Sequence, residues 1–476
     1  MKGDFTRMTF NRDKRFSRVL MQQGRVQLDA DWNEQGDILL HYLRTLAADL
    51  IGPHGGPADS FAIEGLTDDD GEAIRHNFSI GQGHYYVDGI LCENDQDVTF
   101  QSEPNTEPPY PSQPDYPFAQ KVDLAEGDHL IYLDVWERHI SYLEDEDEHG
   151  DEPSIREVAL GGPDTATRAK VVWQIKAWYM TQDRRALLAE MGIDLDCISL
   201  HERWQDVVNL WWQPAVRGRL KAWAKVPEDT GEIDPCTIPP EARYRGPENQ
   251  LYRVEIHDGG PAGEATFKYS RENGSVVYPI EKIQDKQITV QNLGRDDRFG
   301  LQVGDWVEVV DDDYVLQGRA EPLCQVKAID PDELAVIVEP APSAATADPA
   351  KHPLLRRWDH RAAPVTPGGL QLAGDGAARV VSDEGNTVWH LEQGIHIQLT
   401  RADASTFRSG DYWLIPARTA SGDLEWPGTV EDPGELPPHG IEHHYAPLAI
   451  INVNVSGEIT NITECRRTFP ALAQPV

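Results

Sequence analysis

The chain has 476 residues, 39% of them apolar and 26% charged, which is enough for two to four domains with cores of their own. With 43 Lys and Arg against 80 Asp and Glu, its formal charge of −37 disfavours nucleic acid and anionic membranes as partners. The sequence contains neither an apolar run of membrane-spanning length nor the apolar segment of a signal peptide. We therefore expect cytoplasmic synthesis, followed by assembly into a particle that leaves the cell by lysis or through dedicated machinery.

The cysteines are Cys92, Cys197, Cys236, Cys324 and Cys465. Their number is odd, and no two of them have C-x-x-C spacing, so the pattern indicates neither a zinc site nor a full set of disulfides. We expect reduced and mostly buried thiols, which is usual for a protein made in the cytoplasm.

Residues 1–58 predict a docking module in which a strand and a turn lead into a helix. Val19-Leu20-Met21 is typical of the strand, Gly24-Arg25 of the turn, and Asp31 and Glu34 have the spacing of a capping box. The apolar residues that follow at helical period, before Gly52-Pro53 ends the pattern, are Leu39, Tyr42, Leu43, Leu46, Ala47 and Leu50. This helix needs a partner surface, either in its own domain or on a neighbouring subunit.

Residues 59–181 predict a β domain. Residues alternate from Leu130 to Trp136, with Ile131, Leu133 and Val135 on one face. Apolar and polar residues alternate again from Val171 to Tyr179, which is typical of a half-buried strand in an antiparallel sheet. The Pro-rich stretch 104–117 and the acidic run 144–148 predict exposed loops.

Residues 182–245 predict a helical insertion, with its helical pattern over 182–225, followed by a linker. Residues 246–342 predict a small barrel-like β domain, in which Asn273-Gly274 marks a hairpin. A stretch of small residues then precedes a C-terminal β domain at 351–476. The predicted fold class is mainly β and multidomain, with antiparallel sheets, small barrels or sandwiches, an N-terminal helix and one helical insertion.

Several phrases along the chain resemble those of an uncharacterised bacterial family of large β-rich proteins. They are Gly3–Arg7, Val19–Gln35, Tyr132–Arg138, Ala159–Thr165, Glu248–Ile256, Ser270–Gly274, Gly410–Arg418 and His443–Leu448. The resemblance covers nearly the whole chain. It implies no activity that can be carried over, but it implies a location near phage-tail-like and contractile-injection genes.

The N-terminal part is also similar to attachment domains of phage tail fibres. The matching pieces are Gly24-Arg25, Asp31–Gln35 and Gly83–Gly89. This second resemblance implies docking to a baseplate, and it implies no catalytic residues.

The sequence shows no motif for nucleophilic or phosphate-binding chemistry. Gly-x-Ser-x-Gly is absent, and the Gly-bearing segments 161–165 and 371–376 lack the phosphate-cradling pattern. His443 and His444 would point to opposite faces of a strand, so they cannot both bind one ion there. We therefore expect a protein that is not an enzyme and that has no catalytic residue.

Calcium is the only cofactor that the sequence suggests. Asp311, Asp312 and Asp313 could supply oxygen ligands, but the spacing of an EF-hand loop is absent, so a solvated turn is the alternative. The overall acidity has two interpretations. It could simply keep the protein soluble, or it could bind divalent cations or keep many copies of the protein apart at high local concentration.

Aromatic residues are the main candidates for contact surface. Seven tryptophans could lie either in the core or on a contact surface: Trp204, Trp211, Trp212, Trp223, Trp358, Trp389 and Trp413. The phrase Arg356–Asp359 is predicted to hold two domains together, with a subunit contact as the alternative. The predicted interaction residues are Arg25, Trp32, Asn33, Gln35, Tyr86, Trp136, Arg356, Trp358 and Trp413.

The prediction for function is a structural or docking component of a phage-tail-like contractile injection particle, such as a baseplate- or fibre-associated protein. Its partners would be other subunits of the particle and further copies of itself, in a homo-oligomer. The alternative is a carbohydrate-binding protein, or in a weaker version a carbohydrate-cleaving one, with Trp side chains lining a groove for a glycan.

Overall fold

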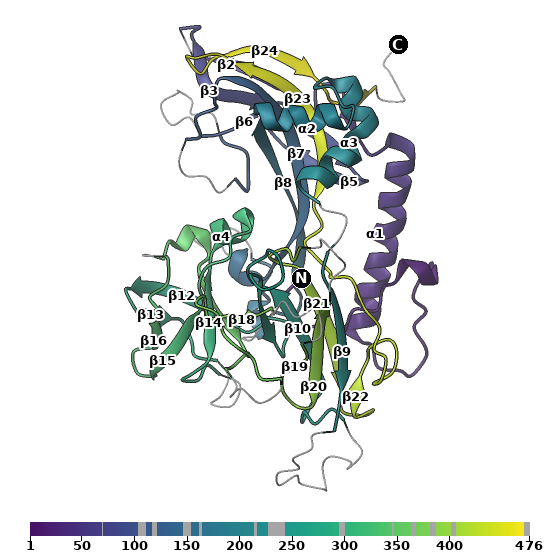
Figure 1. Ribbon diagram of the computed structural model, residues 1–476, viewed down its shortest axis with the longest axis vertical. Coiled ribbons are helices and arrows are strands. Elements are labelled where there is room, and N and C mark those ends of the chain that lie inside the picture. Colours follow the sequence, from purple (N-terminus) through teal and green to yellow (C-terminus); the bar gives the residue numbers. More distant parts are fainter. Residues whose placement is uncertain are drawn as a thin grey trace.

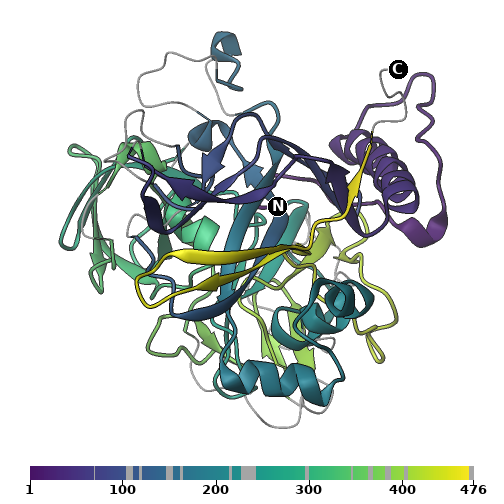
Figure 2. The same cartoon turned by 90° about the horizontal axis from the view of Figure 1, so that it is seen from above.

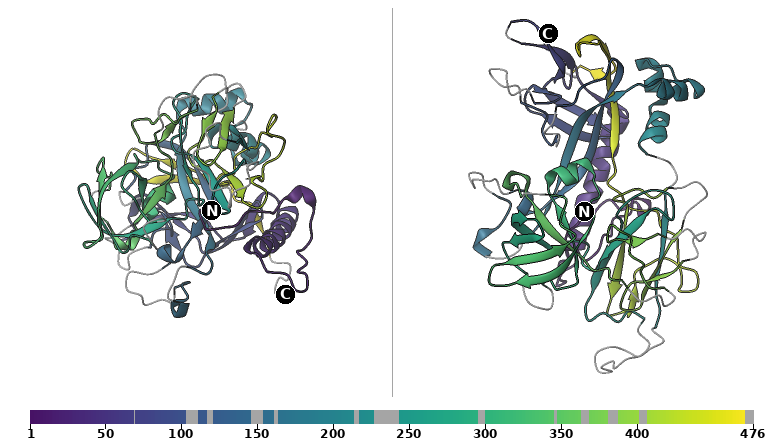
Figure 3. Two further views of the ribbon diagram at one scale, coloured as in Figure 1. Left: turned by 90° about the horizontal axis from the view of Figure 1, so that it is seen from below. Right: turned by 60° about the vertical axis from the view of Figure 1, so that its left-hand side comes forward.

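The computed structural model describes residues 1–68, 70–102, 111–116, 121–145, 154–160, 164–213, 217–226, 243–294, 300–344, 347–362, 368–380, 387–400 and 406–470. These residues form a mainly β fold with four α-helices, which confirms the predicted fold class. The ribbon has an upper part and two lower lobes that lie side by side (Figures 1 and 3). None of the described helices is long and apolar enough to cross a membrane. The predicted loops at 104–117 and 144–148 lie mostly outside the described residues.

The upper part is built on a four-stranded sheet. Its strands, in spatial order, are β24 (Ile459–Glu464), β23 (His444–Val453), β7 (Gly127–Ile140) and β8 (Arg168–Tyr179). All three pairings are antiparallel, as predicted. Alternation along β7 directs Ile131 and Leu133 into one core but Leu130 and Tyr132 into another. Both faces of β7 are therefore buried, because helices cover its second face.

Two smaller sheets close the first of these cores. One contains β25 (Thr468–Phe469), β1 (His54–Pro57), β4 (Gly83–Val87) and β5 (Ile90–Asn94). The other contains β2 (Ile63–Thr67), β3 (Ala73–Ile80) and β6 (Val98–Thr99). Phe61, Phe78 and Tyr85 are fully buried between these sheets and β7.

The second face of the four-stranded sheet is covered by α2 (Gln182–Glu190) and α3 (Cys197–Trp211). The side chain of Asp196 caps α3 by accepting from the backbone N–H groups of Ile198 and Ser199. Cys197 and Cys465 form a disulfide that joins the start of α3 to the segment after β24. The expectation of reduced thiols is therefore wrong for this pair, because the fold brings together two cysteines that are 268 residues apart. Cys92 and Cys324 are free and buried, and Cys236 lies outside the described residues.

One lower lobe is a closed barrel. Its strands are β12 (Val277–Gln284), β13 (Gln287–Val290), β16 (Ala335–Glu339), β15 (Cys324–Asp330), β14 (Trp306–Val310) and β17 (Leu354–Trp358). Helix α4 (Asp312–Gln317) follows β14. The barrel-like domain was expected within residues 246–342, yet β17 comes from beyond that range and pairs with both β12 and β14.

The other lower lobe encloses its core between two sheets. The larger contains β18 (Ala378–Arg379), β11 (Thr266–Ser270), β10 (Gln250–Ile256), β21 (Tyr412–Arg418) and β22 (Asp423–Leu424). The smaller contains β19 (Trp389–His390), β20 (Ile395–Thr400) and β9 (Arg219–Ala224). The domain boundaries stay a prediction, but strand pairing crosses them here and where β23 returns to β7.

The remaining helices are short, apart from one. The 3-10 helices are η1 (Arg12–Lys14), η2 (Tyr142–Glu144), η3 (Val158–Leu160) and η4 (Pro349–Lys351). Helix α1 (Asp29–Ile51) has 23 residues and lies along one side of the molecule, at its edge when seen from above (Figures 1 and 2).

Candidate functional site

Helix α1 is attached to the molecule along one narrow side. Ala30 and Ile38 are its buried residues. The guanidinium of Arg44 makes two hydrogen bonds to the carboxylate of Glu137, at 2.8 and 3.1 Å. Gly89 lies so close that an added Cβ would stand 2.1 Å from the carbonyl oxygen of Arg44. These contacts fix the orientation of α1 and determine which of its faces points outward.

The outward face of α1 carries an apolar stripe, which we call the outer stripe. It consists of Trp32, Gly36, Leu39, Leu43, Leu46 and Leu50. All six residues are exposed, and Trp32 and Leu50 keep 80% and 78% of their accessible surface. Exposed Leu40 and Tyr42 widen the stripe. A contiguous apolar face of this size is characteristic of a protein–protein contact surface.

The chain before α1 forms an arm that extends this surface. Residues 15–28 contain no strand, so the predicted strand at Val19–Met21 is wrong. The helix begins at Asp29 rather than after a capping box at Asp31, and its N-cap residue Leu28 makes no side-chain capping bond. The Asp29 carboxylate accepts a hydrogen bond from the backbone N–H of Thr6 (2.8 Å). Further exposed apolar side chains on the arm are Phe16, Leu20, Met21, Val26 and Leu28.

The predicted interaction residues divide into two groups. Arg25 and Trp32 are exposed, and Asn33 and Gln35 are partly exposed on α1. The side-chain carbonyl of Gln35 accepts from the backbone N–H of Val19 (2.9 Å), which holds the arm beside the helix. The other five positions lie in the interior. Tyr86 is half-buried, and the buried ones are Trp136, Arg356, Trp358 and Trp413.

Arg356 and Trp358 lie at the junction between the barrel and the sheet that contains β10 and β11. The indole N–H of Trp358 donates to Glu308 (2.8 Å), and Lys268 makes an ion pair with the same carboxylate (2.7 Å) while lying over the Trp358 ring. Burial alone would raise the pKa of Glu308, but Lys268 and Lys2 lower it to about 2. These contacts join two lobes and contribute no outer surface.

The three candidate calcium ligands lie at the start of α4. Asp311 caps the helix by accepting from the backbone N–H of Tyr314 (2.7 Å). Asp312 pairs with Arg138 and His352, and Asp313 pairs with Lys351. Among the residues that the structure describes, no group of three or more His, Cys, Asp or Glu side chains could hold a metal ion. The geometry therefore gives no support for a calcium site here.

The tryptophans that could have lined a sugar-binding groove are mostly in the interior. Trp204, Trp358, Trp389 and Trp413 are buried. Trp211, Trp212 and Trp223 are half-buried, and the indole of Trp212 stacks on Tyr132 at a centroid distance of 4.3 Å. Their positions match the core interpretation rather than a platform for sugar rings.

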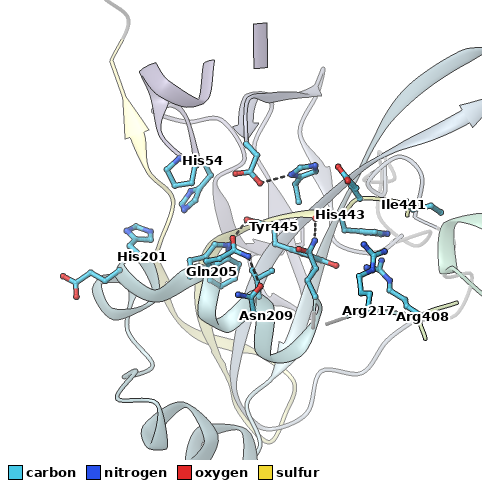
Figure 4. A pocket seen from close by; sticks show the side chains of 17 residues that line it. His54, His201, Gln205, Asn209, Arg217, Arg408, Ile441, His443 and Tyr445 are labelled. Carbon is cyan, nitrogen blue, oxygen red and sulfur yellow. Dashed lines mark hydrogen bonds and ion pairs between the residues drawn. The ribbon is translucent and has the colours of Figure 1, made fainter. Parts of the chain in front are cut away.

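A second feature is a pocket of about 490 Å³ between α3 and the start of β23 (Figure 4). His443 and His444 both line it, but each pairs with a different carboxylate, Asp134 at 2.7 Å and Asp88 at 2.8 Å. Burial would raise the pKa of Asp134, but His443 and Lys176 lower it overall. The two adjacent histidines are thus directed apart, and each is held by its own aspartate.

At the other end of this pocket lie His54 and His201, whose ring centroids are 5.5 Å apart. Burial, reinforced by Arg467 and His201, lowers the pKa of His54 to about 3, so its imidazole is neutral at ordinary pH. Its Nδ1 pairs with the hydroxyl of Tyr85 at 3.1 Å. These histidines come from distant segments with no common motif, so the sequence contained no signal that could have found the pocket.

A family model for a family of unknown function, DUF6519, matches residues 1–191 and 190–474. The chain belongs to this family. The match agrees with the resemblance to an uncharacterised family. No curated protein and no solved structure matches this member of DUF6519. The comparisons do not bear on a link to phage tails, which stays a prediction.

Proposed function

We propose that this protein is a structural docking subunit that assembles with other protein chains through the exposed apolar face of α1. The outer stripe carries this proposal. It is apolar over almost the full length of a 23-residue helix, in a chain whose net charge of −37 otherwise keeps its surface solvated.

The finer part of the proposal is the assembly in which the subunit works, a phage-tail-like contractile injection particle. The phrases Gly24-Arg25, Asp31–Gln35 and Gly83–Gly89, which resemble tail-fibre attachment domains, support it. The first lies in the arm and the second in the first turns of α1. The third covers β4 and the turn at Gly89 that α1 approaches. The parts that resemble an attachment domain are therefore also the parts that carry or position the outer stripe.

Carbohydrate binding was the alternative function. No observation favours it, since the seven tryptophans considered for that role are buried or half-buried. We do not propose it.

The test of the proposal is incorporation into particles. Cells that produce the chain together with its neighbouring genes are lysed, particles are collected by sedimentation, and the protein is detected in the pellet. We expect wild-type protein in the particle fraction and Leu43→Asp in the supernatant. The control is Val303→Asp, because Val303 and Leu43 are similarly exposed, at 62% and 63%. Wild-type protein that never sediments with particles would contradict the phage-tail part of the proposal.

A further inference from the structure

We infer that the outer stripe of α1 packs against the outer stripe of a second copy of this chain, with the two helices antiparallel. This inference rests on the proposed function and names the first partner of that surface. Its evidence is the spacing of the stripe, one unexplained glycine, the complementarity of the stripe with itself, and the charges that border it.

The spacing of the outer stripe is that of a coiled-coil seam. Its six members follow one another at intervals of four, three, four, three and four residues. Apolar positions with this alternation stay on one side of an α-helix and interlock with the same pattern on another helix. The surface therefore fits a helix rather than a strand or a loop.

Among the residues that the structure describes, no contact requires a glycine at position 36. A glycine inside a helix destabilises the helix relative to alanine. An added Cβ at this position would meet no atom within 4 Å, and its φ is not in the left-handed region. Neither intramolecular packing nor backbone conformation requires a glycine. A partner helix that packs closely against the stripe at Gly36 would require a residue without a side chain there.

Antiparallel pairing makes the stripe complementary to itself. When the two helices cross near His41, Trp32 faces Leu50 of the second copy, Gly36 faces Leu46, and Leu39 faces Leu43. The gap at Gly36 then receives a leucine side chain, and the largest residue meets an aliphatic one. Parallel pairing would instead place Gly36 against Gly36 and Trp32 against Trp32. That arrangement leaves a void in one layer and crowding in the next, which close packing disfavours.

The residues that border the stripe keep like charges out of the contact between two copies. Two chains of charge −37 repel each other at long range, and like charges directly opposite one another in the contact would add to that repulsion. The bordering positions are Asn33, Gln35, Leu40, Tyr42, Ala47 and Asp49. Only Asp49 is charged. In the antiparallel pair it lies opposite Gln35, whose carbonyl already accepts from Val19 and whose amide N–H groups can donate to a carboxylate. A second copy therefore fits without facing like charges.

The mass of the purified full chain in solution tests the pairing. We expect a dimer of the 53.3 kDa chain at micromolar concentration by light scattering coupled to gel filtration. Leu43→Asp should weaken the dimer at least about a hundredfold, because one substitution alters two seam positions of the pair. Val303→Asp should remain dimeric. Circular dichroism of Leu43→Asp verifies that the variant is folded. A monomeric wild type, or a dimer that Leu43→Asp leaves unchanged, overturns the inference.

Mixed cysteine cross-linking tests the orientation. Leu39→Cys and Leu43→Cys are introduced in separate chains that also carry Cys236→Ser; the other native cysteines are buried or disulfide-bonded. We expect oxidation to link the two variants when they are mixed and to link neither with itself. Efficient self-linkage of Leu43→Cys would demonstrate parallel helices and overturn the antiparallel arrangement.

The two proposals can fail separately. A chain that is monomeric alone but enters particles through a Leu43-dependent contact keeps the proposed function and overturns the second-copy inference. A Leu43-dependent dimer that never sediments with particles supports the inference and removes the phage-tail assignment.

Discussion

Helices α1 and α3 carry similar sequence patterns but have opposite surroundings. Each has apolar residues recurring every three or four positions. In α3 the residues Leu200 and Val207 are completely buried against β7 and β23, and Trp204 and Val208 are nearly so. In α1 the stripe from Trp32 to Leu50 faces away from the molecule. Periodicity therefore predicts an amphipathic helix but does not reveal whether the surface that its apolar face contacts lies within the chain or outside it.

The attachments of the two helices explain the difference. Helix α3 is tied at its start by the Cys197–Cys465 disulfide, and the indole N–H of Trp204 donates to the carbonyl of Tyr445 on β23 (2.7 Å). Helix α1 is held by the Arg44–Glu137 pair and a buried Ile38. Those α1 anchors lie on the side opposite its widest apolar face, so its own tertiary contacts hold the stripe in solvent.

The largest difference in the free energy of unfolding should come from placing a charge on the apolar face of α3 and on that of α1. Leu200→Asp buries a carboxylate in the α3 core, and we expect it to lower the free energy of unfolding by at least about 4 kcal/mol or to prevent folding. Leu43→Asp should change the unfolding free energy of the monomer by less than about 0.5 kcal/mol. Urea denaturation followed by tryptophan fluorescence measures both. Equal destabilisation by the two variants would show that the α1 stripe is packed within the chain.

Removal of the disulfide should loosen α3 but leave α1 as it is. Cys197→Ala with Cys465→Ala removes a link that closes a loop of 268 residues. We expect a loss of about 2–5 kcal/mol in the free energy of unfolding. The backbone amides of α3 should exchange their hydrogens faster, and the exchange rates in α1 should stay the same. Faster exchange in α1 would indicate that the two helices are coupled.

Acid should destabilise the part of the molecule around α3 through His54. Its pKa is about 3 in the folded chain against an ordinary value near 6.5, so the unfolded chain binds a proton first as the pH falls. The stabilisation is complete above pH 6.5 and is lost progressively below it, by about 2 kcal/mol at pH 5. His54→Gln, which does not titrate, should flatten that part of the pH dependence. Denaturation curves at pH 7 and pH 5 measure the difference; an unchanged slope would contradict this explanation.

The smallest effect should come from Gly36→Ala. The added methyl group meets nothing within the chain, so the higher helix propensity of alanine should stabilise the monomer by up to about 1 kcal/mol. Thermal unfolding of the monomeric Leu43→Asp background, with and without Gly36→Ala, measures this gain. A loss of stability would mean that Gly36 has an intramolecular function after all.

Local sequence patterns were enough to predict the mainly β fold class and the α1 helix. These follow from local periodicity, because a stripe at helical spacing or an alternation over one strand involves neighbours in the chain. The sequence also singled out Arg25, Trp32, Asn33 and Gln35 as interaction residues, which stays a prediction; they lie in the arm or at the start of α1. It did not find the irregular arm at Val19–Met21, where apolar β-type residues lack a strand partner.

Which surfaces are covered depends on contacts between distant segments of the chain. Trp358 and Trp413 look like contact residues in the sequence, but they are buried because β17 completes a barrel and β21 joins β10. The Cys197–Cys465 bond and the pocket around His54 and His443 likewise depend on segments that are far apart in the chain. Such contacts depend on how strands from distant positions pair, and no local pattern contains that information. The direction in which the α1 stripe faces was decided in the same way, by Gly89 and Glu137, which lie outside the helix.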